Sequence, residues 1–199
     1  MGVYSGKLID VRPRSVICHC GRGRKVEDKR GCKMFKVRPF KDGDETHMEE
    51  IAPESFMTLG LARLAIDKGL PRDKVRESYR REARGYAEGV KRGEKGMAIF
   101  VAEEEGKAVG YIVVGVDQRS AEFWGFTWGS IISLAIAPPH WGKGIATRLV
   151  AEGLKWLKAQ GVKYAQVGTD QNNIAAIRAY ENNGFRVVYS EVTLSQFLK

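Results

Sequence analysis

The sequence predicts a mixed α/β domain with a mostly antiparallel sheet and helices on both faces of that sheet. Two apolar runs at 97–104 and 107–117 are joined by a short connection that contains Gly106. Such a pair is typical of a β-hairpin and therefore of antiparallel strands. From residue 130 to residue 184 the pattern changes to strand, helix, strand, helix. An antiparallel beginning and an alternating end together indicate an α/β sandwich.

Length and composition favour one folded domain. The chain has 199 residues, and about 150 residues per domain is the usual expectation. Hydrophobic residues make up 43% of the chain, which is enough for a core. No stretch approaches the roughly 18 consecutive apolar residues that cross a bilayer, and the N-terminus lacks the apolar core of a secretory signal. We therefore expect a cytoplasmic protein with no membrane partner.

The first 33 residues differ from the rest of the chain. Residues 1–33 hold nine Lys or Arg and three Asp or Glu, whereas residues 34–199 hold 24 and 21. The net charge of +9 therefore comes mostly from the N-terminal segment. Since this segment has neither alternation nor helical periodicity, we expect a basic, Cys-containing extension, a disordered arm in the simplest interpretation, before a folded domain at 34–199. A contact of the extension with nucleic acid or an acidic partner stays open.

The extension also holds every cysteine of the chain, at Cys18, Cys20 and Cys32. With His19 they make four side chains of the types that bind zinc. Zinc sites normally separate the two members of a ligand pair by two or more residues, and Cys18 and Cys20 are closer than that. We therefore expect reduced thiols and no metal site.

The first half of the folded domain predicts a strand, helices and the hairpin, in that order. A strand beginning near Met34 leads into a turn at 41–44 and then into a helix. Apolar residues recur at spacings of four and three over 72–90, which predicts a helix with one buried face. After the hairpin comes a loop at 118–129 with four large aromatic residues, Phe123, Trp124, Phe126 and Trp128.

The second half predicts alternating strands and helices. The nearly continuous apolar run at 130–137 indicates a strand that is buried on both faces. An apolar stripe predicts a helix over 144–161, with a glycine at each end. A strand follows at 163–170 and a shorter helix at 173–184. The run at 185–197 predicts a final strand or a pair of strands.

The start of the 144–161 helix carries a chemical implication. Gly142, Lys143 and Gly144 lie between a strand and this helix, and Ala146 follows. The first turn of a helix has backbone N–H groups without intrahelical partners, and small residues leave room for a phosphate group there. A Walker A loop needs Ser or Thr directly after the Lys, and a Rossmann fingerprint needs a third Gly where Thr147 stands, so both are excluded. Glycines that only permit a tight turn are the alternative.

Two motifs on these elements resemble the GNAT superfamily of acyl-CoA N-acyltransferases. The first is an apolar strand, a proline and a small-residue helix start, matched by Leu134, Ile136, Pro138, Gly144 and Ala146. The second is N-x-x-A-x-x-x-Y-x-x-x-G-F, matched by Asn173, Ala176, Tyr180, Gly184 and Phe185. The resemblance covers 34–199, and it implies a GNAT-type sheet that splays at a cofactor slot.

The resemblance also implies an acetyl-CoA-dependent N-acetyltransferase. In this family an amine attacks the thioester directly, and a tyrosine gives a proton to the leaving thiolate; Tyr180 stands at that position. One position departs from the motif, because Trp141 replaces a Gln or Arg, and His140 or Lys143 is expected to supply the polar contact. The residues expected to contact acetyl-CoA are Leu134, Ala135, Ile136, Gly142, Lys143, Gly144, Ile145, Ala146, Thr147, Asn173 and Tyr180.

No general base stands at the positions that relatives use. Histone-type, ribosomal-protein alanine and arylalkylamine acetyltransferases place Glu or His at positions that match Ser130, Gly168 and Ile132 here. The sequence therefore favours an acceptor amine of low pKa, or a water relay to a carboxylate. The carboxylates considered for that relay are Glu103, Glu104, Glu122 and Asp170.

The acceptor is expected to be an amine-bearing small molecule or a protein N-terminus. The aromatic loop at 118–129 could line its pocket, pack on the early helices or make a homodimer contact. A different class of protein also stays open, namely a catalytically silent GNAT fold that acts as an acyl-CoA sensor or a nucleic-acid-associated binding module. Release of thiol with amines would separate the two hypotheses.

Overall fold

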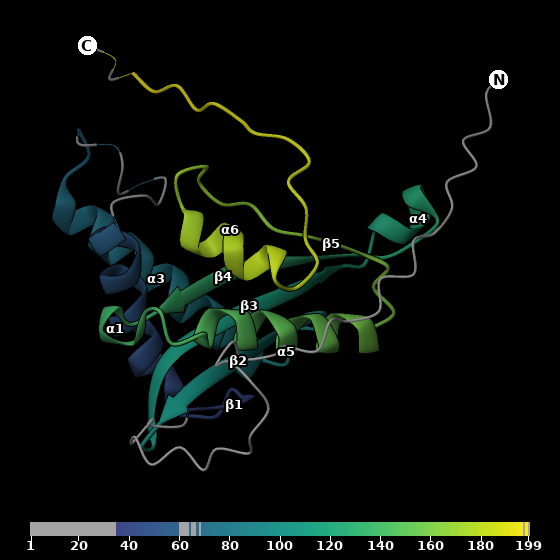
Figure 1. Ribbon diagram of the computed structural model, residues 1–199, viewed down its shortest axis with the longest axis horizontal. Coiled ribbons are helices and arrows are strands. Elements are labelled where there is room, and N and C mark those ends of the chain that lie inside the picture. Colours follow the sequence, from purple (N-terminus) through teal and green to yellow (C-terminus); the bar gives the residue numbers. More distant parts are fainter. Residues whose placement is uncertain (1–34, 60–63, 65–66, 68, 197, 199) are drawn as a thin grey trace, which may run out of the picture. The chain divides into compact units, whose positions relative to one another are not determined.

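A computed structural model describes residues 35–59, 64, 67, 69–196 and 198. The strands are β1 (Lys36–Pro39), β2 (Met97–Glu104), β3 (Lys107–Asp117), β4 (Trp128–Ile136) and β5 (Tyr164–Gln166). The helices are α1 (Asp44–Leu59), α3 (Arg72–Lys91), α4 (Ser120–Trp124), α5 (Ile145–Ala159) and α6 (Ile174–Glu181), with a 3-10 turn, η1, at Pro138–His140 (Figure 1). The expected extension at 1–33 and its cysteines lie outside the described residues.

The strands form one sheet in the order β1-β2-β3-β4-β5. Neighbours are antiparallel from β1 to β4, whereas β5 runs parallel to β4. The predicted hairpin is confirmed, because β2 and β3 pair through a turn at Glu105 and Gly106, whose φ angles are 51° and 81°. Gly106 adopts this left-handed conformation without a steric penalty. The prediction of a mixed, mostly antiparallel sheet is therefore confirmed.

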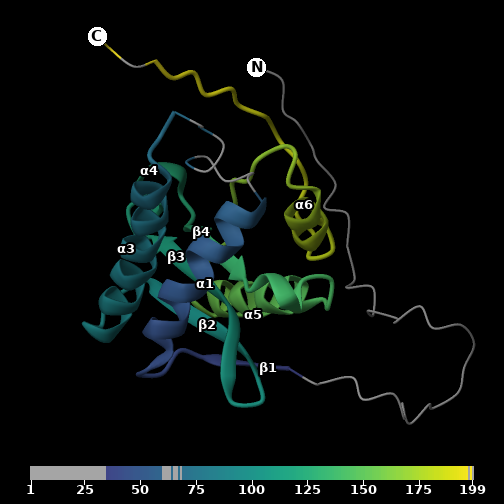
Figure 2. The same cartoon turned by 90° about the vertical axis from the view of Figure 1, so that its left-hand side faces the viewer.

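Helices cover both faces of the sheet, as predicted (Figure 2). Successive residues of a strand point to opposite faces. Val101 and Val113 therefore pack with α1 and α3, while Ile112 and Val114 pack with α5. Burial of an aliphatic side chain of this kind contributes about 1.5–3 kcal/mol. Within the described ranges, no helix has the length and apolar character needed to cross a membrane.

Three segments differ from the expectation. Part of the aromatic loop forms the short helix α4, and the Ser120 hydroxyl ties it to the next strand by accepting the Trp128 N–H at 2.8 Å. β5 ends at Gln166 instead of continuing to residue 170, because β4 and β5 stop pairing there. The strand expected at 185–197 is wrong for the single chain, since residues 185–196 belong to no strand.

An ionic cluster joins β1, α1 and β2. The Arg38 guanidinium donates to Asp44 at 2.6 and 2.8 Å and to Glu103 at 2.6 Å, and Lys36 lies 2.7 Å from Glu103. Hydrogen bonds from Lys36 and Arg38 lower the pKa of Glu103 to about 2. Burial works to raise the pKa of Asp44, but Arg38 and the backbone N–H of Lys41 outweigh it and lower that pKa. The cluster therefore needs both carboxylates ionised.

We expect this cluster to make the protein acid-labile. The folded-state pKa of Glu103 lies below its usual value, so the unfolded chain binds protons more readily, and stability is lost as the pH falls from about 4.5 toward about 2. Glu103→Gln should flatten the dependence of the urea midpoint on pH over this range. Glu191→Gln, at an exposed position, should retain the wild-type dependence. A Glu103→Gln curve parallel to wild type would contradict the assignment.

Candidate active site

The loop before α5 forms an open cradle. Gly142 and Gly144 both have φ of +76°, a conformation that glycine adopts readily, and Gly144 is the N-cap of α5. A Cβ atom built on either glycine meets no atom within 4 Å. The first hydrogen bond of the helix runs from the Arg148 N–H to Gly144 O at 3.2 Å. The N–H groups of residues 145–147 therefore have no acceptor within the helix. The space beside these glycines therefore suits an anionic group.

The edge of β4 opens directly before this cradle. β4 pairs with β5 from Trp128 to Ser130 and with β3 as far as Ile136. Beyond Ser130 one side of β4 therefore has no strand beside it, and Figure 1 shows the chain after β5 diverging from β4. The predicted slot between splayed strands is thus present. It leads toward the start of α5, so a long ligand could lie along β4 with its phosphates at the cradle.

Side chains cover one end of this edge. The Ile136 N–H donates to Ser55 Oγ at 3.4 Å, and the Ile136 carbonyl accepts the Trp141 indole N–H at 2.7 Å. Leu134, two residues earlier, presents its backbone groups on the same side of the strand. Among the described residues, none hydrogen-bonds to those groups of Leu134. The sequence grouped Leu134 and Ile136 as equal contacts, whereas the structure leaves Leu134 as the more accessible one.

A β-bulge at Ile132 changes which face of the sheet the following β4 side chains occupy. Val113 pairs with Ser133 and Val114 pairs with Ile131, so Ile132 is the extra residue. The bulge reverses the alternation and turns Ser133 toward the α1 face, where its hydroxyl donates to the buried Tyr111 hydroxyl at 3.5 Å. Burial raises the pKa of Tyr111. Both hydroxyl groups are therefore buried on the α1 face of the sheet and stay neutral.

The four carboxylates considered for a proton relay are dispersed. Glu103 is held in the β1 cluster, and its pKa of about 2 makes it a poor base. Glu104 lies beside the cradle, 2.9 Å from His140 Nδ1 and 3.7 Å from Lys143 Nζ. Glu122 lies on α4, and Asp170 follows β5. The structure thus brings no pair of them together in the slot.

Glu104, His140 and Lys143 form a charged group at the cradle. Glu104 is only 7% exposed, and its Oε1 atom is buried without a hydrogen-bond partner. Lys143 Nζ also lies 3.3 Å from His140 Nδ1. His140 and Lys143, either of which was expected to replace the missing Gln or Arg, are therefore both positioned by a buried carboxylate, which the sequence analysis had considered only as a proton acceptor.

Tyr180 lies in the core between α6 and α5. It is 7% exposed, and its ring packs edge-on against Phe185 at a centroid distance of 5.8 Å. Burial raises its pKa to about 12. The phenol therefore stays protonated over the physiological pH range and can act as a proton donor.

Two asparagines position α6. Asn173 is the N-cap of α6, and its Oδ1 accepts the Ala176 N–H at 3.2 Å, so its side chain fixes the start of the helix. Asn183 donates to Thr147 O at 3.1 Å and to Ala179 O at 2.8 Å, which links α6 to the first turn of α5. The sequence analysis missed Asn183. The only feature of the sequence that pointed to Asn183 was its position directly before Gly184, the glycine that follows α6.

The aromatic loop lies at the opposite end of β4 from the cradle. Trp128 stacks on Trp124 at 5.4 Å and contacts Tyr164 at 4.6 Å, and Phe123 is 80% exposed. β4 contains nine residues at about 3.3 Å each, which separates its ends by roughly 26 Å. The aromatic side chains stack mainly on one another, so a direct contact with a ligand's phosphates is excluded.

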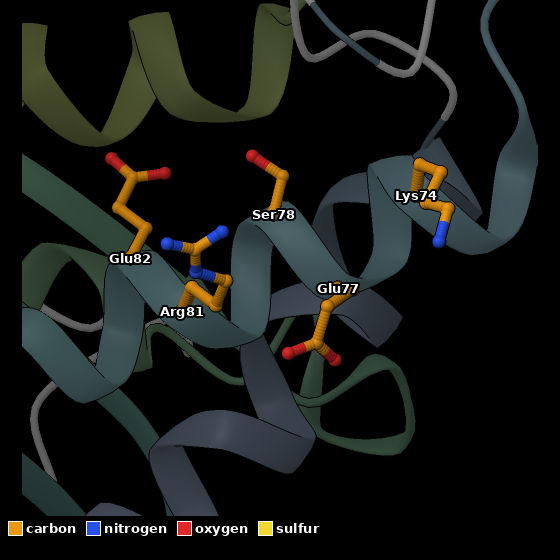
Figure 3. A pocket seen from close by; sticks show the side chains of 5 residues that line it. All are labelled: Lys74, Glu77, Ser78, Arg81 and Glu82. Carbon is orange, nitrogen blue, oxygen red and sulfur yellow. The ribbon is translucent and has the colours of Figure 1, made fainter.

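A surface hollow of about 560 Å³ lies on α3 and is lined by Lys74, Glu77, Ser78, Arg81 and Glu82. Figure 3 shows that these side chains do not converge, because Glu77 points away from the side that Ser78 and Glu82 occupy. None of the site residues predicted from the sequence lines it. The hollow therefore adds no chemistry to the slot.

The cradle, the splayed strands and the tyrosine helix occur together in a known family. The sequence profile of the Acetyltransferase (GNAT) family matches residues 61–185. The chain belongs to this family.

The spore coat polysaccharide biosynthesis protein SpsD of Bacillus subtilis is 28% identical over 153 residues, which are 76% of this chain and 47% of SpsD. An L-methionine sulfoximine/L-methionine sulfone acetyltransferase of Salmonella typhimurium is 33% identical over 92 residues, 46% of this chain and 52% of that protein. The chain thus spans about half the length of these curated relatives.

Solved structures of the GNAT fold superimpose on this chain. The PaiA N-acetyltransferase of Thermoplasma acidophilum, in complex with coenzyme A, has a TM-score of 0.62 at 18% identity and covers 79% of this chain and 93% of its own. A GNAT family acetyltransferase of Brucella melitensis, in complex with acetyl-CoA, has a TM-score of 0.55 at 18% identity, with coverages of 78% and 84%. These likenesses establish the fold of this GNAT member and agree with acetyl-CoA as the donor.

The Trp141 indole N–H is expected to help hold the cradle of this GNAT protein in place. Trp141→Phe keeps an aromatic ring but removes the bond to the Ile136 carbonyl, whose loss costs about 0.5–1.5 kcal/mol. Acetyl-CoA affinity, measured by calorimetry, should therefore fall by about 2- to 12-fold. Trp124→Phe makes the same chemical change at the other end of β4 and should leave affinity unchanged. Equal affinity in both variants would show that the bond does not support binding.

Proposed function

We propose that this protein transfers the acetyl group of acetyl-CoA to a primary amine, either a small amine or a peptide α-amine. The observation that carries the proposal is the alignment of the open β4 edge with the glycine cradle of α5. The two form one continuous path for a ligand with an amide-containing arm and a pyrophosphate. Acetyl-CoA is such a ligand, and it supplies the activated acetyl group as a thioester.

Residues of the chain divide the work of binding and proton transfer. Backbone amides over 142–147 hold the pyrophosphate, and Lys143 and His140 supply polar side-chain contacts near it. Leu134 pairs with an amide of the pantetheine arm at the free edge of β4. Tyr180 donates its phenolic proton to the departing thiolate, and a backbone N–H at the β4 bulge serves as the donor to the developing negative charge on the carbonyl oxygen.

The empty base positions point to the class of amine. A lysine side chain with a pKa near 10.4 costs about 4.6 kcal/mol to deprotonate at pH 7, whereas a peptide α-amine near pKa 8 costs about 1.4 kcal/mol. Of the carboxylates considered for that step, Glu103 is paired with Arg38, and Glu104 is held beside His140 at the cradle. The α-amine is therefore the favoured acceptor. Relatives named N-alpha-acetyltransferase in Arabidopsis thaliana and Sulfolobus acidocaldarius, at 30% and 29% identity, support this choice.

A panel of amines tests the function. Free thiol released from acetyl-CoA should rise with peptide α-amines and small amines of low pKa, and it should stay near the background rate with N-acetylated peptides that offer only lysine side chains. Binding of coenzyme A without thiol release across the panel would instead select the alternative function, a catalytically silent acyl-CoA sensor or nucleic-acid-associated module. No binding of either cofactor form would reject both.

We also propose that residues 34–199 fold and act without residues 1–33. The body that carries the cradle, slot and Tyr180 begins at β1 (Lys36–Pro39). A chain starting at Met34 should therefore keep the melting temperature and thiol-release rate of the full chain. A large fall in either quantity would assign a structural or catalytic role to 1–33.

A further inference from the structure

Glu82 is a carboxylate of α3 that forms no ion pair with any described residue. The other acidic residues of this helix, Asp73, Glu77 and Glu88, lie 3.9, 3.9 and 3.6 Å from a basic side chain of the same helix or its C-cap. Glu82 instead accepts the Tyr86 hydroxyl on its Oε1 atom at 2.5 Å. A charge-assisted hydrogen bond of this length fixes the carboxylate in place. Its remaining lone pairs are available to a cation.

Glu82 lies on the side of α3 that is turned away from α1. Arg84 and Lys91 pair with carboxylates of α1, so their side of α3 faces that helix. Glu82 precedes Arg84 by two residues, which at 3.6 residues per turn puts it on the opposite side of α3. Although Glu82 also lines the surface hollow, its side chain shares a side with Ser78, whereas Glu77 points away (Figure 3). The carboxylate is therefore not taken up by the contacts between the two helices.

Three side chains connect Glu82 to the bulge of β4. Tyr86, which holds Glu82, packs against the core that contains Tyr111, and the Tyr111 hydroxyl lies 3.5 Å from Ser133 Oγ. Burial is the main cause of the raised pKa of Tyr111, and the nearby charge of Glu82 adds to it. Ser133 directly follows the bulge residue Ile132, which is 43% exposed. Glu82 therefore belongs to the α1–α3 face of the sheet, near the part of β4 that borders the slot.

We propose that Glu82 binds the ammonium group of the acceptor amine on this face of the sheet. The inference rests on the proposed function. Since α5 packs on the opposite face, an amine reaches a thioester in the slot from the α1–α3 face. An ammonium group there supplies the positive charge that Glu82 lacks, and its N–H groups suit the carboxylate. The bound ammonium must still lose a proton before it attacks, so an amine of low pKa remains favoured.

Steady-state kinetics of the full chain with a peptide α-amine test this role. Glu82→Gln should raise the KM for the amine by about 10- to 100-fold, the usual effect of losing a hydrogen bond to a charged group. Its acetyl-CoA dissociation constant should equal that of the wild type. Tyr86→Phe keeps the ring but releases the carboxylate, and it should raise the same KM by about 2- to 12-fold. Glu77→Gln makes the matched change on the other side of α3 and should leave KM unchanged.

Calorimetry with an unreactive amine separates the outcomes. A peptide with a dimethylated N-terminus keeps a charged N–H donor but cannot form an amide. It should bind the coenzyme A complex of the wild type at least about tenfold more tightly than that of Glu82→Gln, whereas the neutral N-acetylated peptide should not distinguish the two. Equal KM and equal binding in both proteins, a loss confined to kcat, or the same loss in Glu77→Gln would overturn the role of Glu82 and leave the proposed function standing. A wild type that releases no thiol with any amine and binds no dimethylated peptide would overturn both.

Discussion

Gly144→Val is expected to raise the acetyl-CoA dissociation constant by about 100-fold or more. A branched side chain at the N-cap of α5 would occupy the open space beside the first-turn amides, where the pyrophosphate is proposed to lie. Hydrogen bonds to a charged group are worth about 1.5–3 kcal/mol each, and the loss of two corresponds to roughly 100-fold or more. Titration calorimetry with acetyl-CoA measures the change directly.

Gly161→Val is the matched control for this substitution. Gly161 follows the other end of α5, with φ of +79° against +76° at Gly144, and a Cβ atom at either position meets nothing within 4 Å. Both variants therefore carry a similar backbone strain of about 1–2 kcal/mol and should lose similar stability. Only Gly144→Val should lose the cofactor. Equal dissociation constants in the two variants would remove the cradle from the binding site.

Tyr180→Phe is expected to lower kcat by about 10²- to 10⁴-fold, the usual contribution of a general acid. The substitution keeps the ring and its contact with Phe185, so folding and acetyl-CoA affinity should be close to wild type. Stopped-flow detection of the free thiol, at saturating acetyl-CoA and amine, gives kcat. A variant with the wild-type rate would make solvent the proton source.

The pH dependence and a second tyrosine refine this test. Because burial raises the pKa of Tyr180 to about 12, its acid form persists as the pH rises, and kcat should show no loss of activity from this group below about pH 10. Tyr189→Phe removes the same hydroxyl at a position that is 76% exposed and should leave kcat unchanged. A matching decrease in both variants would attribute the effect to something other than proton donation at Tyr180.

Local patterns were sufficient to predict much of the fold. The β2–β3 hairpin and the start of α5 depend on glycines whose backbone conformations other residues adopt at a cost, so short sequence signals identify them. The same kind of local signal gave a wrong prediction for the run at 185–197. Its residues favour a strand, but a strand also needs a neighbour, and none of the described strands pairs with it.

The residues proposed to carry the chemistry were chosen from the sequence, but their surroundings could not be. Gly144 and Tyr180 are proposed because both belong to motifs that resemble those of the family. The covering of Ile136 by Ser55 joins residues 81 positions apart, and the bond from Asn183 to Thr147 spans 36 positions. Neither contact produces a periodic pattern in the sequence, because local propensities do not specify which distant side chain reaches a given backbone group.

The sequence by itself therefore determined the family, the α/β order and the position of the glycine cradle before α5, all of which follow from short-range patterns. The tertiary structure decided which backbone groups of β4 remain accessible, which carboxylates are neutralised by cations, and how deeply Tyr180 is buried. These properties depend on contacts across the sheet and between helices. Accessibility, charge pairing and burial are properties of a packed environment, and that environment exists only once distant segments have come together.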